Sequence, residues 1–241
     1  DPIPYDAGLA LGSARYLWHH VLDNPRIKWE DNSSPYLGFK YDEKLTLDTL
    51  DNFQDKVDYK RVDDEDVVDL LIEKNVISIF GGGSESGRRA LGNRSIIADP
   101  RHADMKTIVN ERVKHRQWYR PFAPSILREH VSEWFVRDIS SPYMSFAIPF
   151  KEEKVDLVPA VVHLDNTARL QTVTKKDNSW YHSFISKFFD KTGVPIILNT
   201  SFNDREPIVE FPEHAVKCFL KTQIDYLYFY DYGILVSKRQ Q

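Results

Sequence analysis

Residues 76–94 read VISIFGGGSESGRRALGNR, and this stretch decides the fold class. Its first five residues are mostly β-branched or apolar and predict a short strand that runs into a glycine-rich turn. Three arginines follow the glycines, so positive charge gathers at the end of a strand. Because strand ends of open α/β sheets are favoured ligand positions, the segment predicts an anion site on such a sheet.

The glycines alone do not identify a nucleotide loop. The segment has neither the G-x-x-x-x-G-K-[ST] pattern nor G-x-G-x-x-G followed by a helix, and a plain flexible turn would explain it equally well. Anion binding is favoured by Arg88, Arg89 and Arg94, because a guanidinium holds a phosphate through two parallel N–H bonds.

Charge is distributed unevenly along the chain. Residues 88–128 hold ten Lys or Arg against three Asp or Glu, a net +7, whereas the whole chain carries −4. The remaining 200 residues therefore carry −11, which argues against a general nucleic-acid coat and for a localised anionic ligand. No apolar run approaches the roughly 20 residues needed to span a bilayer, and a cytoplasmic location is expected.

The 241 residues suit one domain with an appendage. Residues 1–58 are predicted to be the tail of a missing domain, with a helix over 6–22 and a turn-rich linker over 23–58. Residues 59–241 are predicted to be the compact domain. Its expected helices cover 63–74, 102–116, 179–191 and 212–221, and its expected strands cover 76–80, 144–149, 160–163, 168–173 and 194–198. Interleaved strands and helices predict an α/β (α+β) sheet domain, with Cys218 buried on a helix face.

Further candidate residues lie in a basic turn after residue 113. Lys114 ends a predicted helix, and Arg120 follows six residues later, before Pro121 closes the turn. A compact ammonium and a planar guanidinium suit a polyphosphate, with Trp118 and Tyr119 expected as packing anchors. A solvated helix face is the alternative.

Two strand segments supply the remaining candidates. In TARLQTV, residues 167–173, Arg169 projects from a strand among apolar neighbours, which is costly without an anion or an acid as its partner. In VPIILNTSFN, residues 194–203, Asn199 and Ser201 emerge where an apolar strand ends. An internal salt bridge and a simple Asx or Ser turn are the respective alternatives.

Six ordered motifs carry a family resemblance. They are RALGNRSI at 89–96 with ADPR at 98–101, Lys114-x5-Arg120-PFAP, SPYM at 141–144, TARLQ at 167–171, LNTSFN at 198–203, and EPIV at 206–209. Together they resemble the C-terminal half of the nodulation-protein-U type O-carbamoyltransferases. The resemblance implies a YrdC-like twisted, open, mixed sheet with flanking helices.

The same resemblance implies a reaction and a site. The domain would bind ATP with Mg²⁺ and carbamoyl phosphate, and form carbamoyl adenylate for a hydroxyl-bearing acceptor such as a sugar or antibiotic. Phosphate groups would be held by Arg89, Lys114, Arg120 and Arg169, with Arg89, Lys114 and Arg120 in the catalytic role. Asn199 and Ser201 would complete the nucleotide site.

The N-terminal segment also resembles this family. Residues 5–14, YDAGLALGSA, look like the segment that closes an N-terminal ASKHA-like domain, whose aspartate helps to bind Fe²⁺. Asp6 is that aspartate here, although Tyr5 replaces the usual Gly and the expected partner histidines are absent. A helix N-cap is the alternative role for Asp6. Three further positions depart from the family: Ser86 and Arg88 replace a usual Phe and Pro, and Asn166 takes a common Gly position. A homodimer is a possible oligomeric state.

Two other classes of protein are alternatives to an O-carbamoyltransferase. A related YrdC-type enzyme makes threonylcarbamoyl adenylate for tRNA modification, but the LNTSFN and TARLQ segments point away from it. A nucleic-acid-binding module could use the cationic cluster with Trp118 and Tyr119, and its binding should fall steeply with salt.

Overall fold

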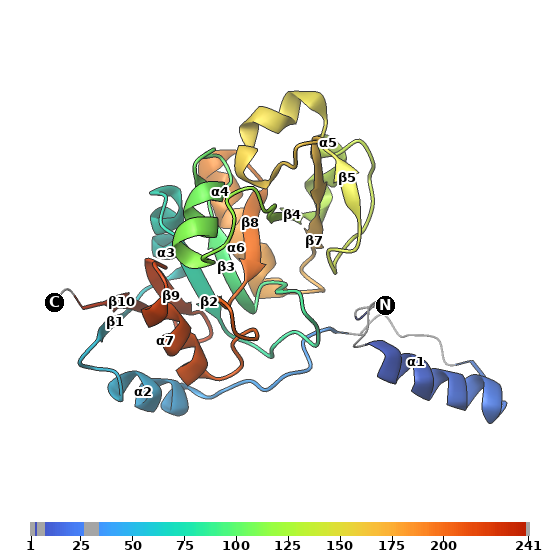
Figure 1. Ribbon diagram of the computed structural model, residues 1–241, viewed down its shortest axis with the longest axis horizontal. Coiled ribbons are helices and arrows are strands. Elements are labelled where there is room, and N and C mark those ends of the chain that lie inside the picture. The colour runs from blue at the N-terminus through green and yellow to red at the C-terminus, as the bar shows by residue number, and fades with distance from the viewer. Residues whose placement is uncertain (1–2, 4–7, 27–33, 240–241) are drawn as a thin grey trace.

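The computed structural model describes residues 3, 8–26 and 34–239 of the chain. In this part of the chain an eight-stranded mixed sheet is covered by helices on both faces, and a two-stranded sheet lies beside it (Figure 1). The predicted α/β class, with a mixed sheet and flanking helices, is confirmed.

Strand order decides where the site can form. Across the large sheet the strands are β1 (Val57–Arg61), β10 (Ile234–Lys238), β9 (Tyr226–Phe229), β2 (Ile77–Phe80), β3 (Arg94–Ala98), β8 (Ile196–Ser201), β4 (Ala123–Leu127) and β7 (Gln171–Val173). The pairs β2·β9 and β4·β7 are parallel, and the other neighbours whose register is known are antiparallel. Strands β2 and β8 therefore end at the same edge of the sheet where β3, β4 and β7 begin.

The helices are α1 (Leu9–Tyr16), α2 (Glu43–Asp51), α3 (Asp64–Ile72), α4 (Met105–Ile108), α5 (Val131–Trp134), α6 (Ser179–Thr192) and α7 (Pro212–Lys221), with shorter 3₁₀ and π turns between them. Helix α6 packs on β4 and β8 with α3 beside it, while α7 packs on β2 and β9 with α2 beside it. Tyr228 of β9 contacts Trp180 of α6, so this side chain lies on the face of the sheet that α6 covers.

Three predicted helices are confirmed to within two residues, and their ends have local causes. Asp63 caps α3 by accepting hydrogen bonds from the backbone N–H groups of Glu65 and Asp66, both at 2.9 Å, and Asp66 bonds back to Asp63. Asn178 caps α6, and Pro212 stands in the first turn of α7. Cys218 of α7 is buried, as predicted.

Other predicted elements differ in the structure. Residues 160–163 are not a strand, because a 3₁₀ turn over Pro159–Val161 begins at a proline and the Ala160 N–H bonds to the Pro100 carbonyl. The predicted strand over 168–173 breaks at Leu170 into β6 (Thr167–Arg169) and β7, which belong to different sheets. Strand β6 pairs with β5 (Ala147–Pro149), which is shorter than the predicted strand over 144–149.

The predicted helix over 102–116 is also shorter and less regular than expected. It comprises α4 and a π-helical turn over Val109–Val113, and ends at Lys114. Residues 6 and 7 of the predicted helix over 6–22 lie outside the described residues. The described part holds α1 and a π-helical turn over Leu17–Val21, and none of the residues from 9 to 21 is buried. This segment lies apart from the sheet (Figure 1).

The range 23–58 holds more regular structure than a turn-rich linker. Asp42 caps α2, and the buried residues of that helix are Thr46, Thr49 and Leu50. Two threonines on the buried face weaken the apolar periodicity, which explains why the helix was not predicted. The domain boundary near residue 58 stays a prediction, and Val57 already pairs with Lys238.

Candidate functional site

Two cavities meet at the edge of the sheet where β2 and β8 end. The larger is about 310 Å³ and the smaller about 100 Å³, and both are lined by Arg88, Arg89, Met144 and Arg169. Pro35, Glu85 and Tyr143 add to the larger cavity, whereas Arg116, Asn199 and Ser201 add to the smaller. Segments far apart in the sequence thus meet around a strongly cationic hollow.

The glycine-rich loop is folded by a buried carboxylate. Glu85 Oε1 accepts hydrogen bonds from the backbone N–H groups of Leu91, Asn93 and Arg94, at 2.7, 2.9 and 3.3 Å. Burial raises the pKa of Glu85, and these backbone bonds oppose that rise. The ring closed around Glu85 presents Arg88 and Arg89 to the cavities. The only sequence signal for this role was a single acidic residue among the glycines.

Arg94 supports the loop and lines neither cavity. Its Nη1 donates to the carbonyls of Gly81 and Asn93 at 2.6 and 2.9 Å, and its guanidinium lies 3.6 Å from the Phe80 ring centroid. The prediction that Arg94 joins Arg88 and Arg89 at an anion is therefore wrong in this geometry. Gly82, at φ +52°, gives the carbonyl-rich turn its left-handed backbone.

Arg169 is a partly buried arginine that lines both cavities. Its Nε is buried and has no hydrogen-bond partner among the described residues. Burial, together with the charges of Arg89 and Arg88, lowers the pKa of Arg169 to about 10. Three like charges near one hollow favour an anion between them.

Arg116, which no sequence pattern distinguished from its basic neighbours, also lines the smaller cavity. Its Nε donates to Asn110 Oδ1 at 2.7 Å, and Asn110 Nδ2 in turn donates to the carbonyls of Trp118 and Arg120. Burial lowers the pKa of Arg116 to about 10, with a smaller contribution from Arg120. Asn110 therefore fixes the basic turn and aims Arg116 inward. Spacing alone did not reveal this, because Arg116 was not distinguished from its basic neighbours.

Arg120 and the adjacent aromatics lie outside this hollow. Arg120 is exposed and lines neither cavity. Trp118 and Tyr119 are 61% and 58% exposed, so the prediction that they anchor the turn by packing is wrong. Hydrogen bonds from Asn110 hold the turn instead.

Lys114 is buried beside the hollow and bound to the protein's own oxygens. Its Nζ donates to the carbonyls of Ser201 and Asn203 at 2.5 and 2.7 Å, and to Asn203 Oδ1 at 2.8 Å. Ser201 Oγ lies 3.3 Å away. Burial lowers the pKa of Lys114 to about 7, and the Arg116 charge acts in the same direction. Lys114 therefore ties the end of the π-helical turn to the end of β8.

Asn199 belongs to a buried amide network. Its Nδ2 donates to Gln171 Oε1 at 2.8 Å and to Ser125 Oγ and the Ala90 carbonyl at 3.1 Å. Gln171 Nε2 donates to the Leu91 carbonyl at 2.9 Å. The network connects β8, β4 and β7 to the arginine loop. Of the predicted site residues, the structure thus brings Arg89, Arg169, Asn199 and Ser201 to one cavity.

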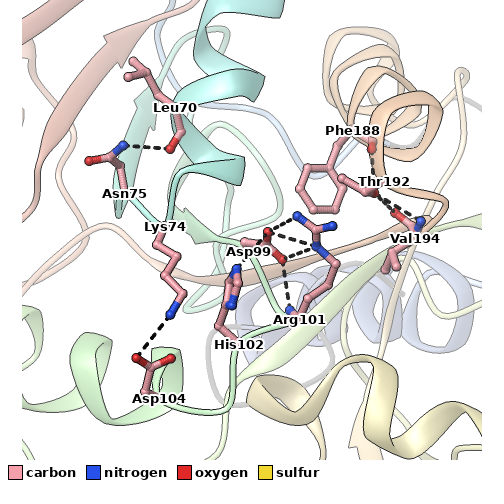
Figure 2. A network of polar contacts seen from close by, with 10 residues as sticks. All are labelled: Leu70, Lys74, Asn75, Asp99, Arg101, His102, Asp104, Phe188, Thr192 and Val194. Carbon is pink, nitrogen blue, oxygen red and sulfur yellow. Dashed lines mark hydrogen bonds and ion pairs between the residues drawn. The ribbon is translucent and has the colours of Figure 1, made fainter.

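Another partly buried arginine is neutralised within the protein (Figure 2). Arg101 Nη2 and Nε lie 2.6 and 3.0 Å from Asp99 Oδ2, and the Asp99 side chain is fully buried. His102 Nε2 lies 3.6 Å from the same oxygen. This cluster stands at the opposite end of β3 from the arginine loop.

The structure offers little to a resident metal ion. No group of three or more His, Cys, Asp or Glu suited to a metal occurs in the ranges that the structure describes, and Asp6 lies outside them. Among the described residues, Glu85 is the one carboxylate that lines the two cavities, and its Oε1 binds the backbone. The donor set therefore does not fit a protein-held Mg²⁺ or Fe²⁺.

No helix of the described chain is long and apolar enough to cross a membrane.

Comparison with known proteins places the chain in a family. Residues 68–236 match the family model for the carbamoyltransferase C-terminus. The chain therefore belongs to the carbamoyltransferase C-terminal family. The resemblance inferred from the six sequence motifs is confirmed at this level, and 68–236 covers every one of them.

Two relatives are longer than this chain. Nodulation protein NolNO of Sinorhizobium fredii is 41% identical over 99% of this chain and 36% of its own length. Nodulation protein NolO of Bradyrhizobium diazoefficiens is 41% identical over 93% of this chain and 42% of its own. The chain thus spans about two fifths of these relatives. A full-length HypF crystal structure in a phosphate- and nucleotide-bound form matches 77% of this chain and 22% of its own, with 16% identity and a TM-score of 0.48.

Proposed function

We propose that this domain binds ATP and carbamoyl phosphate and forms carbamoyl adenylate, the activated group of an O-carbamoyltransferase. The carrying observation is the smaller cavity, where Arg169 has a buried Nε unpaired within the described chain and shares the lining with Arg88, Arg89 and Arg116. The partly buried Arg169 guanidinium needs an anionic partner. The match to the carbamoyltransferase C-terminal family supports the choice of ATP and carbamoyl phosphate as the anions.

The proposed reaction balances in two steps. Water cleaves carbamoyl phosphate to carbamate and inorganic phosphate. A carbamate oxygen then attacks the α-phosphorus of ATP, the bond to the bridging oxygen breaks, and pyrophosphate leaves. Both substrates are strongly anionic, so the arginines lower their mutual repulsion and orient them, and charge that develops on pyrophosphate meets the same fixed guanidiniums.

Each predicted site residue has a place in this proposal. Arg89 and Arg169 bind phosphate oxygens directly, and Asn199 and Ser201 form the wall at the end of β8. Lys114 acts through Ser201, since its ammonium holds the Ser201 carbonyl. Arg120 contributes positive charge from outside the cavity. Mg²⁺ enters with the phosphates of ATP, because the protein provides no carboxylate set for it in the described region.

The fate of the carbamoyl group is part of the same proposal. A hydroxyl of a small-molecule or sugar acceptor receives it, and this step uses a region that the longer relatives have and that this chain does not span.

One observation favours a second candidate function. Trp118 and Tyr119 are exposed next to the basic turn, an arrangement that also suits stacking of single-stranded nucleic acid. Binding to an oligonucleotide that falls steeply with salt and is unaffected by ATP would support this candidate.

Two measurements test the main proposal. Calorimetry should show binding of Mg·ATP, and a coupled assay should show pyrophosphate release that depends on carbamoyl phosphate. No carbamoylated sugar alcohol is expected from this chain alone. Absence of ATP binding at millimolar concentration, in a sample whose far-UV spectrum shows it folded, would reject the nucleotide site.

A further inference from the structure

Residues 35–38 form a strap that lies against the glycine-rich loop. The Pro35 carbonyl accepts a hydrogen bond from the Ser86 N–H at 2.7 Å, and the Gly38 N–H donates to the Ser84 carbonyl at 3.1 Å. Neither bond belongs to a helix or to one of the two sheets. Two backbone hydrogen bonds therefore hold the strap on the loop.

The strap also contributes to the wall of the site. Pro35 is buried and lines the larger cavity, as do Ser86 and the two arginines that follow it on the loop. Residues 35–38 lie outside the range 68–236 that matches the family model. A segment from outside the matched range thus borders the cationic site.

The contact between strap and loop is close enough to require glycine on both sides. A Cβ atom on Gly38 would lie 2.8 Å from the backbone nitrogen of Ser84. A Cβ atom on Gly83 would lie 2.7 Å from the Gly38 carbonyl oxygen and 3.0 Å from that of Tyr36. A side chain at either position would force the two segments apart, so the strap packs directly on the backbone of the loop.

Tyr36 of the strap holds the other end of the same loop. Its hydroxyl donates to the Leu91 carbonyl at 3.0 Å, and its ring packs against the small apolar cluster to which Leu91 belongs. Ser86 and Leu91 flank the two cavity arginines of the loop in the sequence. The strap therefore restrains the loop on both sides of these arginines.

We propose that Tyr36 is a positioning residue for Arg88 and Arg89, and that the strap fixes the loop in the geometry that binds phosphate groups. A loop held at both ends loses less conformational entropy when an anion binds, so the restraint raises affinity. Tyr36 and Gly38 line neither cavity, so both act on a ligand only through the loop. The inference rests on the proposed function in assigning phosphate ligands to the cavities.

Tyr36→Phe tests the strap, with inorganic pyrophosphate as the probe. Calorimetry on the whole chain should show this variant binding pyrophosphate about two- to tenfold more weakly than the wild type, because one neutral hydrogen bond to the loop is lost. The melting temperature should change little, since the Leu91 carbonyl retains its bond from Gln171 Nε2 at 2.9 Å.

Tyr59→Phe is the matched control. It removes a hydroxyl that donates to Asp51 at 2.9 Å on the edge strand β1, and it should leave the affinity for pyrophosphate unchanged. A lower melting temperature of Tyr36→Phe with unchanged affinity would overturn the proposal, because a bond that serves only the fold gives that result.

Hydrogen exchange on the wild type is a second measurement that needs no variant. Coupling between two sites is reciprocal, so saturating pyrophosphate should slow exchange of the Gly38 amide by a similar two- to tenfold factor. The Asn75 amide, which bonds to the Leu70 carbonyl at the opposite end of β2, should not change. Unaltered exchange at Gly38 would overturn the proposal, and this measurement decides if Tyr36→Phe does not fold.

The outcomes separate this inference from the proposed function. Weaker pyrophosphate binding by Tyr36→Phe, in a chain whose wild type forms no carbamoyl adenylate, supports the strap and rejects the reaction. Equal binding by Tyr36→Phe and the wild type, with normal pyrophosphate release by the wild type, rejects the strap alone. No pyrophosphate binding by the wild type rejects both.

Discussion

Arg101 and Arg169 are two partly buried arginines in one domain, and their surroundings are opposite. Arg101 lies against the fully buried carboxylate of Asp99, with contacts as short as 2.6 Å. Arg169 has Arg88 and Arg89 as its main charged neighbours, and these lower its pKa. The difference indicates that Arg101 is paired for the fold and that Arg169 is placed for a ligand.

The electrostatics behind this contrast predict opposite effects of mutation. Removing one member of a buried pair strands the other charge and destabilises the fold. Removing one of several like charges relieves repulsion in the empty protein and removes affinity for an anion. Substitutions can therefore test whether the two regions differ as the contacts indicate.

The largest expected effect is that of Asp99→Ala. It should lower the free energy of unfolding by about 3 kcal/mol, because Arg101 loses its carboxylate and its side chain is only 28% exposed. Urea unfolding followed by circular dichroism measures this. Asp138→Ala is the matched control, since its pair with Arg128 is largely exposed and should cost under about 1 kcal/mol. Similar losses in both variants would contradict a structural role for Asp99.

Lys114→Met should come next, with a loss of about 2 kcal/mol in unfolding free energy at neutral pH. It leaves the carbonyls of Ser201 and Asn203 without their charged donor. Lys44→Met, at an exposed position, should change stability by no more than about 0.5 kcal/mol. If Lys114→Met is as stable as that control, Lys114 serves the ligand alone.

The stability of the wild type should also depend on pH through Lys114. Its pKa falls to about 7 in the folded state from an ordinary 10.5, so between these values the unfolded chain binds more protons than the folded one. Stability should therefore rise with pH across this window, by at most about 1.4 kcal/mol per unit. The full cost of burying the charge is present below pH 7. Measuring the difference from Lys114→Met at each pH cancels other groups, and a flat difference would contradict the lowered pKa.

Arg169→Gln should change binding and leave stability unaltered. Affinity for phosphate ligands should fall about ten- to a hundredfold, because a charge-assisted hydrogen bond is lost. The unfolding free energy should stay equal or rise slightly, since Arg88 and Arg89 lose a repulsive neighbour. Arg137→Gln, at an exposed surface position, should affect neither quantity. A destabilised Arg169→Gln with unchanged affinity would place Arg169 with Arg101 as a structural residue.

The sequence predicted those elements whose signals are local. Helices α3 and α6 have side-chain caps, Asp63 and Asn178, that mark their first turns. Strands β3 and β4 were missed because they are fully buried and lack alternation, and because Arg94 and Pro124 both argue against a central strand. Asn166, where the family commonly has Gly, adopts φ +58°, a region that Asn tolerates better than most residues.

The sequence predicted a site residue where a charged side chain occurs among the apolar residues of a strand. Arg169 was identified because an arginine among apolar strand residues requires a partner. Glu85 and Arg116 were not identified, because their roles depend on a loop that closes on a carboxylate and on a turn held by Asn110. The contact between Lys114 and Ser201 spans 87 positions, and no local pattern indicates it.

The smallest expected effect concerns Arg120, and it decides whether the cationic region extends beyond the cavities. Arg120 is exposed and reaches the site through its charge on Arg116. An exposed charge acting at a distance is worth under about 1 kcal/mol, so Arg120→Gln should weaken ATP binding only a few-fold and leave the melting temperature unchanged. The loss should vanish in 1 M salt, where the screening length is about 3 Å. A loss of tenfold or more that persists in high salt would instead show that Arg120 turns inward and binds phosphate directly with Lys114.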